Sequence, residues 1–162
     1  NISAAQLSRK EFRDSVMTIL KETGARPEEL CLELTERCRD LDVTFLKNEV
    51  NFFHSKGIKI ALDDFGTGYS NFHYLSELKP EIIKIDRSFT AKAVADKQEY
   101  YLLNQFCTMT HNLDMRICIE GVENEQEWAM IRKLYPEFTQ GYFWGKPCGY
   151  EEFIGKFTEN RL

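Results

Sequence analysis

Short apolar segments alternate with longer amphipathic segments along the chain. The apolar segments are short enough for strands, and they read LCLELTE, IKIALDD, EIIKID, MRICIE and FTQGYFW. Helical spacing of apolar residues characterises the intervening segments, at about residues 4–23, 42–57, 70–78, 97–112, 123–135 and 150–160. This alternation predicts parallel βα units, which build either an open doubly wound sheet or a closed (β/α) barrel. In both architectures, functional residues gather at the carboxyl ends of the strands.

Composition narrows the class of protein. The 162 residues are 43% hydrophobic and 29% charged with a net charge of −5, as expected of one soluble globular domain. The apolar runs are too short for a membrane span and no signal peptide is recognised, so we expect a cytoplasmic protein without membrane contact. The mild acidity and the lack of Lys or Arg runs argue against DNA as a partner. Five cysteines without a C-x-x-C pair argue against a disulfide framework or a zinc cluster.

Carboxylates stand at the carboxyl ends of four successive predicted strands. The polar side chains at the strand ends are Glu33, Glu36, Asp63, Asp64, Lys84, Asp86, Glu120, Glu123 and Gln140. Any one carboxylate there is more often a helix N-cap or a solvated loop residue, and a single lysine is more often a surface residue. Several carboxylates that converge on one space repel one another unless a cation lies among them. Oxygen ligands favour Mg²⁺ or Mn²⁺, and the adjacent Asp63 and Asp64 could serve two ions in a two-metal site.

Glycines follow the double aspartate in the stretch ALDDFGTGYS. Gly66 and Gly68 could form a simple tight turn or a mobile loop beside the metals. The pattern lacks both the G-x-G-x-x-G spacing of dinucleotide sites and the G-K-[ST] of a P-loop, so a glycine-rich phosphate cradle is not indicated.

The motifs resemble those of the EAL-domain family, bacterial phosphodiesterases that cleave cyclic di-GMP. The resemblance lies in LELTE, ALDDFGTGYSNFHYLSELKPEIIKIDRSF, IEGVENEQEW and TQGYFWGKP, which occur in that order. It implies a TIM-type barrel, a two-metal site with Mg²⁺ or Mn²⁺, and hydrolysis of cyclic di-GMP to linear pGpG.

The resemblance also implies roles for individual residues. The implied metal ligands are Asn1 of the N-x-S motif, Glu33, Asp63 as a bridge between the ions, Asp64 and Glu120. The implied catalytic residues are Lys84, which orients the attacking water, Glu120, Gln140 near that water, and Glu36, which supports the loop after the double aspartate. The implied loop consists of Phe65, Gly66, Thr67, Gly68, Tyr69 and Ser70.

One departure from the family pattern concerns the start of the chain. The motif that names the family should lie upstream of N-x-S, and a TIM barrel typically takes about 250 residues. We therefore expect residues 1–162 to form a partial EAL domain, the C-terminal two-thirds of an incomplete α/β barrel that lacks the first strand or strands and their helices. Asn1 would then have no preceding strand to hold it, so we expect weakened metal binding and impaired turnover. A second copy of the chain could cover the unpaired strand edge, which makes a homodimer a further hypothesis.

Two other functions compete with the phosphodiesterase. One is a catalytically inactive EAL-like receptor that binds cyclic di-GMP or a protein partner. The other is a different metal-assisted barrel enzyme, such as an enolase-like one, although this does not account for DDFGTGYS. The histidines His54, His73 and His111 are predicted to be surface or packing residues rather than metal ligands.

Overall fold

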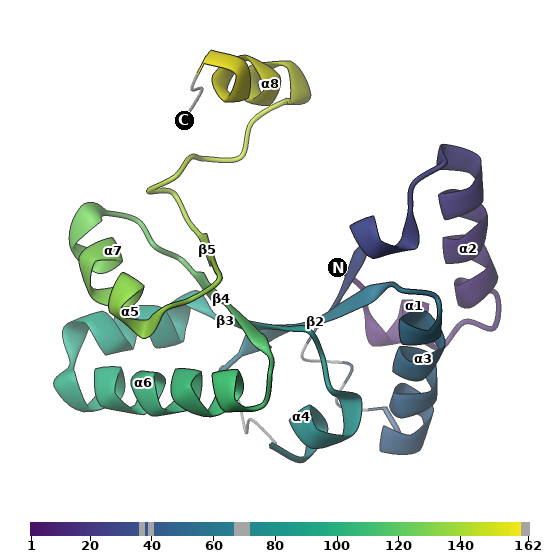
Figure 1. Ribbon diagram of the computed structural model, residues 1–162, viewed down its shortest axis with the longest axis horizontal. Coiled ribbons are helices and arrows are strands. Elements are labelled where there is room, and N and C mark those ends of the chain that lie inside the picture. The colour runs from purple at the N-terminus through teal and green to yellow at the C-terminus, as the bar shows by residue number, and fades with distance from the viewer. Residues whose placement is uncertain (36–37, 39–40, 67–71, 160–162) are drawn as a thin grey trace.

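A parallel five-stranded sheet with helices on its outer side forms the body of the protein. The computed structural model describes residues 1–35, 38, 41–66 and 72–159 (Figure 1). The strands are β1 (Cys31–Leu34), β2 (Lys59–Phe65), β3 (Ile82–Ile85), β4 (Arg116–Glu120) and β5 (Phe138–Gln140). The helices are α1 (Ala4–Leu7), α2 (Phe12–Thr23), η1 (Pro27–Glu29), α3 (Val43–Ser55), α4 (Phe72–Leu78), α5 (Arg87–Ala95), α6 (Lys97–Asn112), α7 (Glu125–Ile131), η3 (Arg132–Leu134) and α8 (Tyr150–Glu159).

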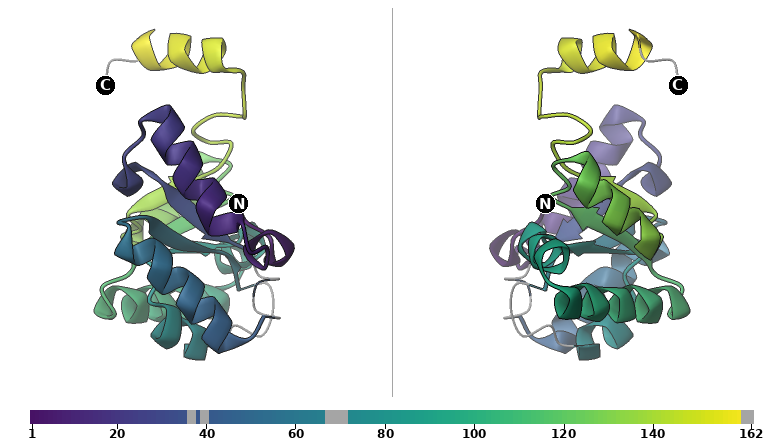
Figure 2. Two further views of the ribbon diagram at one scale, coloured as in Figure 1. Left: turned by 90° about the vertical axis from the view of Figure 1, so that its right-hand side faces the viewer. Right: turned by 90° about the vertical axis from the view of Figure 1, so that its left-hand side faces the viewer.

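The strand order decides between the two architectures that the sequence left open. The order is β1-β2-β3-β4-β5, and every neighbouring pair is parallel. In a doubly wound sheet the strand order reverses at a switch point. In a (β/α) barrel, neighbouring strands follow one another in sequence order, as they do here. Helices α3, α4 and α6 accordingly lie on one side of the sheet, while α8 stands apart on the other (Figures 1 and 2).

Apolar side chains between the sheet and its helices form two clusters. One cluster surrounds β3 and β4, where Ile83, Ile85, Ile117 and Ile119 are fully buried against residues of α5, α6 and α7. The other joins α2 and α3 to β1 and β2, and its largest fully buried side chain is Phe53 of α3. The hydrophobic core therefore lies between the sheet and the helices that cover it. The carboxyl ends of the strands, called the upper ends from here on, remain available for polar groups.

The helices begin and end largely where local sequence signals predict. Asp42, Asp96 and Asn124 are N-caps whose side chains accept backbone N–H groups of α3, α6 and α7. Gly24 ends α2 with a left-handed φ of 71°. Two differences from the prediction stand out. Residues 4–23 form two helices rather than one, because a Ser3 capping box starts the short α1 and a turn follows it. Helix α5 was not predicted, and only Thr90 and Ala93 of that helix are buried.

Two histidines take part in matching contacts at the lower rim, where strands begin. His54 Nε2 lies 3.2 Å from Glu81 Oε2, which also accepts the N–H of Ile60 at 2.8 Å. His111 Nε2 likewise lies 3.4 Å from Glu137 Oε2, which accepts the N–H of Ile117 at 2.7 Å. We call these arrangements the two clasps. Each joins the last turn of a helix to the starts of two neighbouring strands, so both histidines have a structural role.

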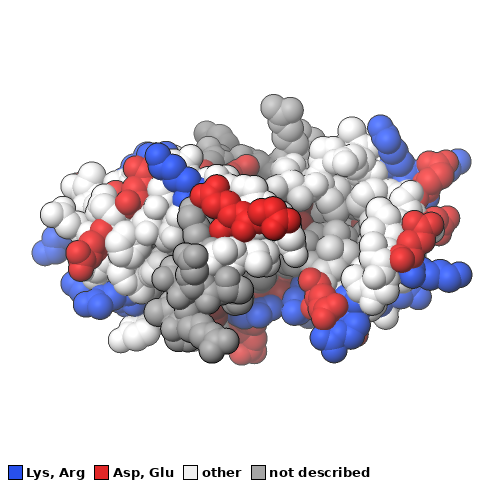
Figure 3. All heavy atoms as spheres, turned by 90° about the horizontal axis from the view of Figure 1, so that it is seen from above, with Lys and Arg blue, Asp and Glu red and all other residues white. Residues whose placement is uncertain are grey.

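The cysteines and the surface charges of the described residues show no special arrangement. All five cysteines are free, and Cys38, Cys107 and Cys118 are buried, as expected of packing residues. Among the described residues, no helix combines the length and the apolar character needed to cross a membrane. Seen from above, acidic and basic side chains are interspersed around a largely uncharged surface (Figure 3).

Candidate metal centre at the upper strand ends

A β-bulge in β2 explains how two adjacent aspartates can serve one site. Leu62 pairs with Ile83 and Phe65 pairs with Ile85, so β2 holds one more residue than β3 over this stretch. In a regular strand, neighbouring side chains point to opposite faces. The bulge and the left-handed φ of 55° at Asp64 interrupt that alternation. As a result, Asp63 and Asp64 both reach the same space as Glu120 from β4.

The three carboxylates form a compact group. One oxygen from each of Asp63, Asp64 and Glu120 lies within 4.8 Å of the others. Side-chain oxygens at this separation are the hard donors that Mg²⁺ and Mn²⁺ take in proteins.

Lys84 of β3 lies at the centre of the carboxylates from the neighbouring strands. Its Nζ is 2.7 Å from Glu120 Oε1, 2.8 Å from Asp63 Oδ1 and 3.0 Å from Glu33 Oε2. Only 8% of Lys84 is exposed. Burial alone would lower the pKa of Lys84, but Asp63, Glu120 and Glu33 outweigh it and hold the pKa well above its usual value. These carboxylates therefore favour the ammonium form of Lys84, which donates hydrogen bonds to them.

The single ammonium does not balance the negative charge around it. Burial raises the pKa of Glu120, and the charges of Asp63 and Asp64 raise it further, against the lowering effect of Lys84. Asp63 Oδ1 is buried, and the Lys84 ammonium lies 2.8 Å from it. Several buried carboxylates that converge on one ammonium repel one another unless a further cation lies among them. The donor set therefore fits a divalent cation.

Ile2, the residue after Asn1, is held by the sheet, whereas the sequence predicted only that Asn1 has no preceding strand to hold it. Ile2 forms a parallel bridge with Leu34, and its N–H donates to the carbonyl of Glu33 at 2.8 Å. Ile2 is also buried in the core, at 5% exposure. This bridge places Asn1 beside the end of β1, the strand that carries Glu33, while the ligand role of Asn1 stays a prediction.

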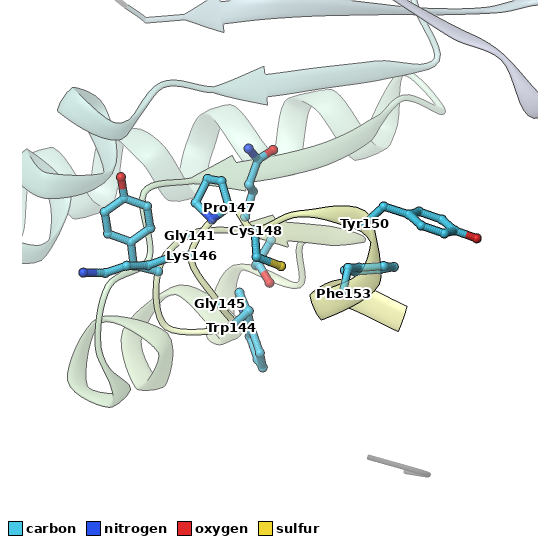
Figure 4. Close-up of a pocket in the computed structure, with 11 residues that line it drawn as sticks. Gly141, Trp144, Gly145, Lys146, Pro147, Cys148, Tyr150 and Phe153 are labelled. Atoms are coloured by element: carbon cyan, nitrogen blue, oxygen red, sulfur yellow. The ribbon is translucent and has the colours of Figure 1, made fainter. Parts of the chain in front are cut away.

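Other predicted site residues lie nearby or outside the described residues. Gln140 of β5 pairs in register with Glu120 of β4. It also lines a cavity of about 570 Å³ between β5 and α8. In Figure 4, Trp144 and Lys146 belong to the segment after β5, whereas Tyr150 and Phe153 come from α8. Of the implied loop, Phe65 is buried and Gly66 has a φ of 105°. Glu36 and residues Thr67, Gly68, Tyr69 and Ser70 lie outside the described residues.

Two strand-end residues have structural roles instead. Asp86 is the N-cap of α5, where its Oδ1 accepts the N–H of Ser88 at 2.8 Å. Glu123 pairs with Arg87, with 2.6 Å between Oε1 and Nη2. Sequence reasoning gave no weight to Arg87. Its position directly after the capping aspartate was the only available signal.

Consecutive parallel strands with a group of carboxylates at their carboxyl ends define a barrel-type α/β protein with its polar site at those ends. Residues 1–147 match the EAL domain, and the chain belongs to the EAL-domain family. This membership excludes the enolase-like alternative.

Similar proteins extend the comparison. PdeG of Escherichia coli K12, described as a probable cyclic di-GMP phosphodiesterase, is 36% identical over 95% of this chain and 30% of its own length. The EAL domain of Mycobacterium smegmatis DcpA is 30% identical with a TM-score of 0.91, over all of this chain and 73% of that one. Klebsiella pneumoniae BlrP1, in a manganese and cyclic di-GMP complex, is 25% identical with a TM-score of 0.77, over 88% of this chain and 36% of that one. This chain thus spans about a third of the relative PdeG, and the neighbours confirm the TIM-type fold.

Proposed function

We propose that this chain is the catalytic part of a metal-dependent phosphodiesterase that hydrolyses cyclic di-GMP to linear pGpG. The observation that carries the proposal is the group formed by Asp63, Asp64 and Glu120, whose oxygens lie within 4.8 Å of one another. Membership of the EAL-domain family and the name of PdeG support the reaction. The manganese complex of BlrP1 supports Mg²⁺ or Mn²⁺ as the ions.

We infer that the carboxylates hold the ions and that the neighbouring side chains prepare the water. Asp63, Asp64, Glu120 and Glu33 are the proposed metal ligands, with Asn1 beside them. Bound there, Mg²⁺ or Mn²⁺ would supply Lewis-acid polarisation of a phosphodiester oxygen and lower the pKa of a bound water.

Lys84 has a second proposed role besides balancing charge. Its ammonium can donate a hydrogen bond to the oxygen of a water and so fix the direction of that water towards the phosphorus. We propose that Gln140, which pairs with Glu120 across the strands, forms a further hydrogen bond to this water. A carboxylate such as Glu120, whose pKa is raised, is the proposed group that receives the proton of the water.

The test is a product assay with the purified protein, cyclic di-GMP and Mn²⁺, followed by chromatography. We expect pGpG from the unchanged protein, at the impaired rate that the sequence predicts, none after EDTA, and none from Asp63→Asn. The matched control is Asp14→Asn, because Asp14 is an exposed aspartate of α2 remote from the carboxylate group.

Two outcomes would redirect the proposal. Wild-type turnover by Asp63→Asn would refute the role of Asp63 at the metal. Cyclic di-GMP that is bound but recovered intact in the presence of Mn²⁺, both by this chain and by a version extended upstream, would favour a receptor. Homodimerisation, a cytoplasmic location and lack of DNA contact stay predictions of the sequence.

A further inference from the structure

Two glycine turns directly follow the residues of the carboxylate group. Gly66 follows Phe65 at the end of β2 with a φ of 105°, and Gly121 follows Glu120 at the end of β4 with a φ of 75°. A Cβ atom at Gly66 would lie 3.0 Å from Cδ1 of Phe89. A Cβ atom at Gly121 would overlap the side chain of Arg87 and lie 3.0 Å from its Cα. Both turns are therefore packed against the same neighbour, the first turn of α5.

The first turn of α5 is itself well anchored. The N–H of Asp86 donates to the carbonyl of Phe65 at 3.2 Å, which ties the start of the helix to β2. Phe89 packs against the core, and Thr90 is buried at 1% exposure. This segment cannot shift without disturbing the core below it.

Arg87 connects the same turn to β4. Its aliphatic stem covers Gly121, and its guanidinium pairs with Glu123 Oε1 at 2.6 Å. Between these two contacts lies Val122, which is fully buried and whose N–H donates to the carbonyl of Gln140 at 3.2 Å. Residues 121–123 are thus held by two neighbours. Arg87 contacts Gly121 and Glu123, and Gln140 of β5 binds the backbone of Val122.

We propose that Arg87 is a positioning residue of the metal centre. The stem of Arg87 and the ring of Phe89 together fix the turns after Glu120 and after Phe65, and so fix the separation of the carboxylates of Glu120 and Asp64. The proposal rests on the metal site of the proposed function but not on the identity of the substrate. Loss of a group that hydrogen-bonds to a metal ligand typically changes metal affinity by about 10–100-fold, and Arg87, which acts through the turn after the ligand, is expected at the lower end of that range.

Charge and packing make opposite predictions for Arg87. If Arg87 acted only as a nearby positive charge, its removal would strengthen the binding of a cation. If its stem positions Glu120, truncation weakens binding, and a neutral side chain of similar length preserves it. Arg87→Ala and Arg87→Met therefore separate the two effects.

The experiment measures the Kd of Mn²⁺ by electron paramagnetic resonance, without cyclic di-GMP. We expect Arg87→Ala to raise the Kd by about tenfold, whereas Arg87→Met stays within about twofold of the unchanged protein. Lys92→Ala, which truncates an exposed lysine of the same helix, is the matched control. An unchanged Kd in Arg87→Ala, a lower Kd in both variants, or an equal rise in both would overturn the proposal.

A second readout does not depend on the metal. Hydrogen exchange of the metal-free protein should become faster at the Val122 amide in Arg87→Ala but not in Arg87→Met. If the unchanged protein binds no Mn²⁺, the proposed metal site fails, and this exchange result alone decides whether Arg87 holds the turn. Equal exchange rates in all variants would then refute the positioning role.

Discussion

Replacement of Lys84 by methionine tests the electrostatics of the site most directly. The ammonium lies within 3.0 Å of three carboxylates and is almost fully buried, so its removal leaves converging negative charges without their counter-ion. Loss of one partner from a buried ionic group costs about 3–5 kcal/mol. For a chain of this size that corresponds to a fall in Tm of roughly 6–20 °C in EDTA.

Addition of Mn²⁺ should reduce this loss. The Lys84 ammonium repels a cation and shares its carboxylate ligands, so Lys84→Met should bind Mn²⁺ more tightly than the unchanged protein. Binding that is about tenfold tighter recovers about 1.4 kcal/mol of the loss at saturating metal. The assay is urea denaturation with EDTA and with Mn²⁺, and Lys92→Met is the control for removal of an exposed lysine. A loss that is the same in both conditions, or one below about 1 kcal/mol in EDTA, would refute the reasoning.

Two further predictions concern the stability of the fold. Burial alone would raise the pKa of Glu137, but the N–H of Ile117 and the nearby His111 lower it overall. Glu137→Gln should therefore cost about 1 kcal/mol at pH 7, a value kept small by solvent screening of the partly exposed carboxyl. Because the folded pKa is the lower one, the difference should shrink as pH falls below the ordinary glutamate pKa of about 4.3 and vanish below the folded pKa, and a difference that persists in strong acid would contradict the assignment. Phe53→Ala, at a side chain with 1% exposure, should cost about 3–5 kcal/mol by urea denaturation with an unchanged slope, and a cost below about 1 kcal/mol would show that the cluster repacks.

The alternation of strands and helices was enough to predict parallel βα units. The structure confirms this prediction. It succeeded because apolar strands must be covered by amphipathic helices, and both patterns are strong in the sequence. Helix α5 was missed because its own apolar pattern is weak. Only Thr90 and Ala93 of that helix are buried, so RSFTAKAVA carries little periodic apolar signal. The capping aspartate Asp86 was the available clue, and it was taken for a site residue instead.

The candidate site was predictable in its residue types but not in its geometry. Strand ends indicate which side chains share a rim, yet simple alternation would send Asp63 and Asp64 to opposite faces. The β-bulge that brings them together arises from pairing with β3, which no local pattern encodes. The position of Lys84 between three carboxylates likewise depends on the register of four strands.

The two clasps at the lower rim imply that the chain has an internal repeat. In each, a histidine from the end of a helix meets a glutamate that follows a proline and begins the next strand but one in the chain. The unit that recurs is thus a pair of βα segments rather than a single one, in keeping with a barrel whose alternate strands play equivalent parts. A substitution that strengthens the clasp of Glu81 should therefore be transferable to that of Glu137, and at the opposite rim from the carboxylates it would leave the chemistry untouched.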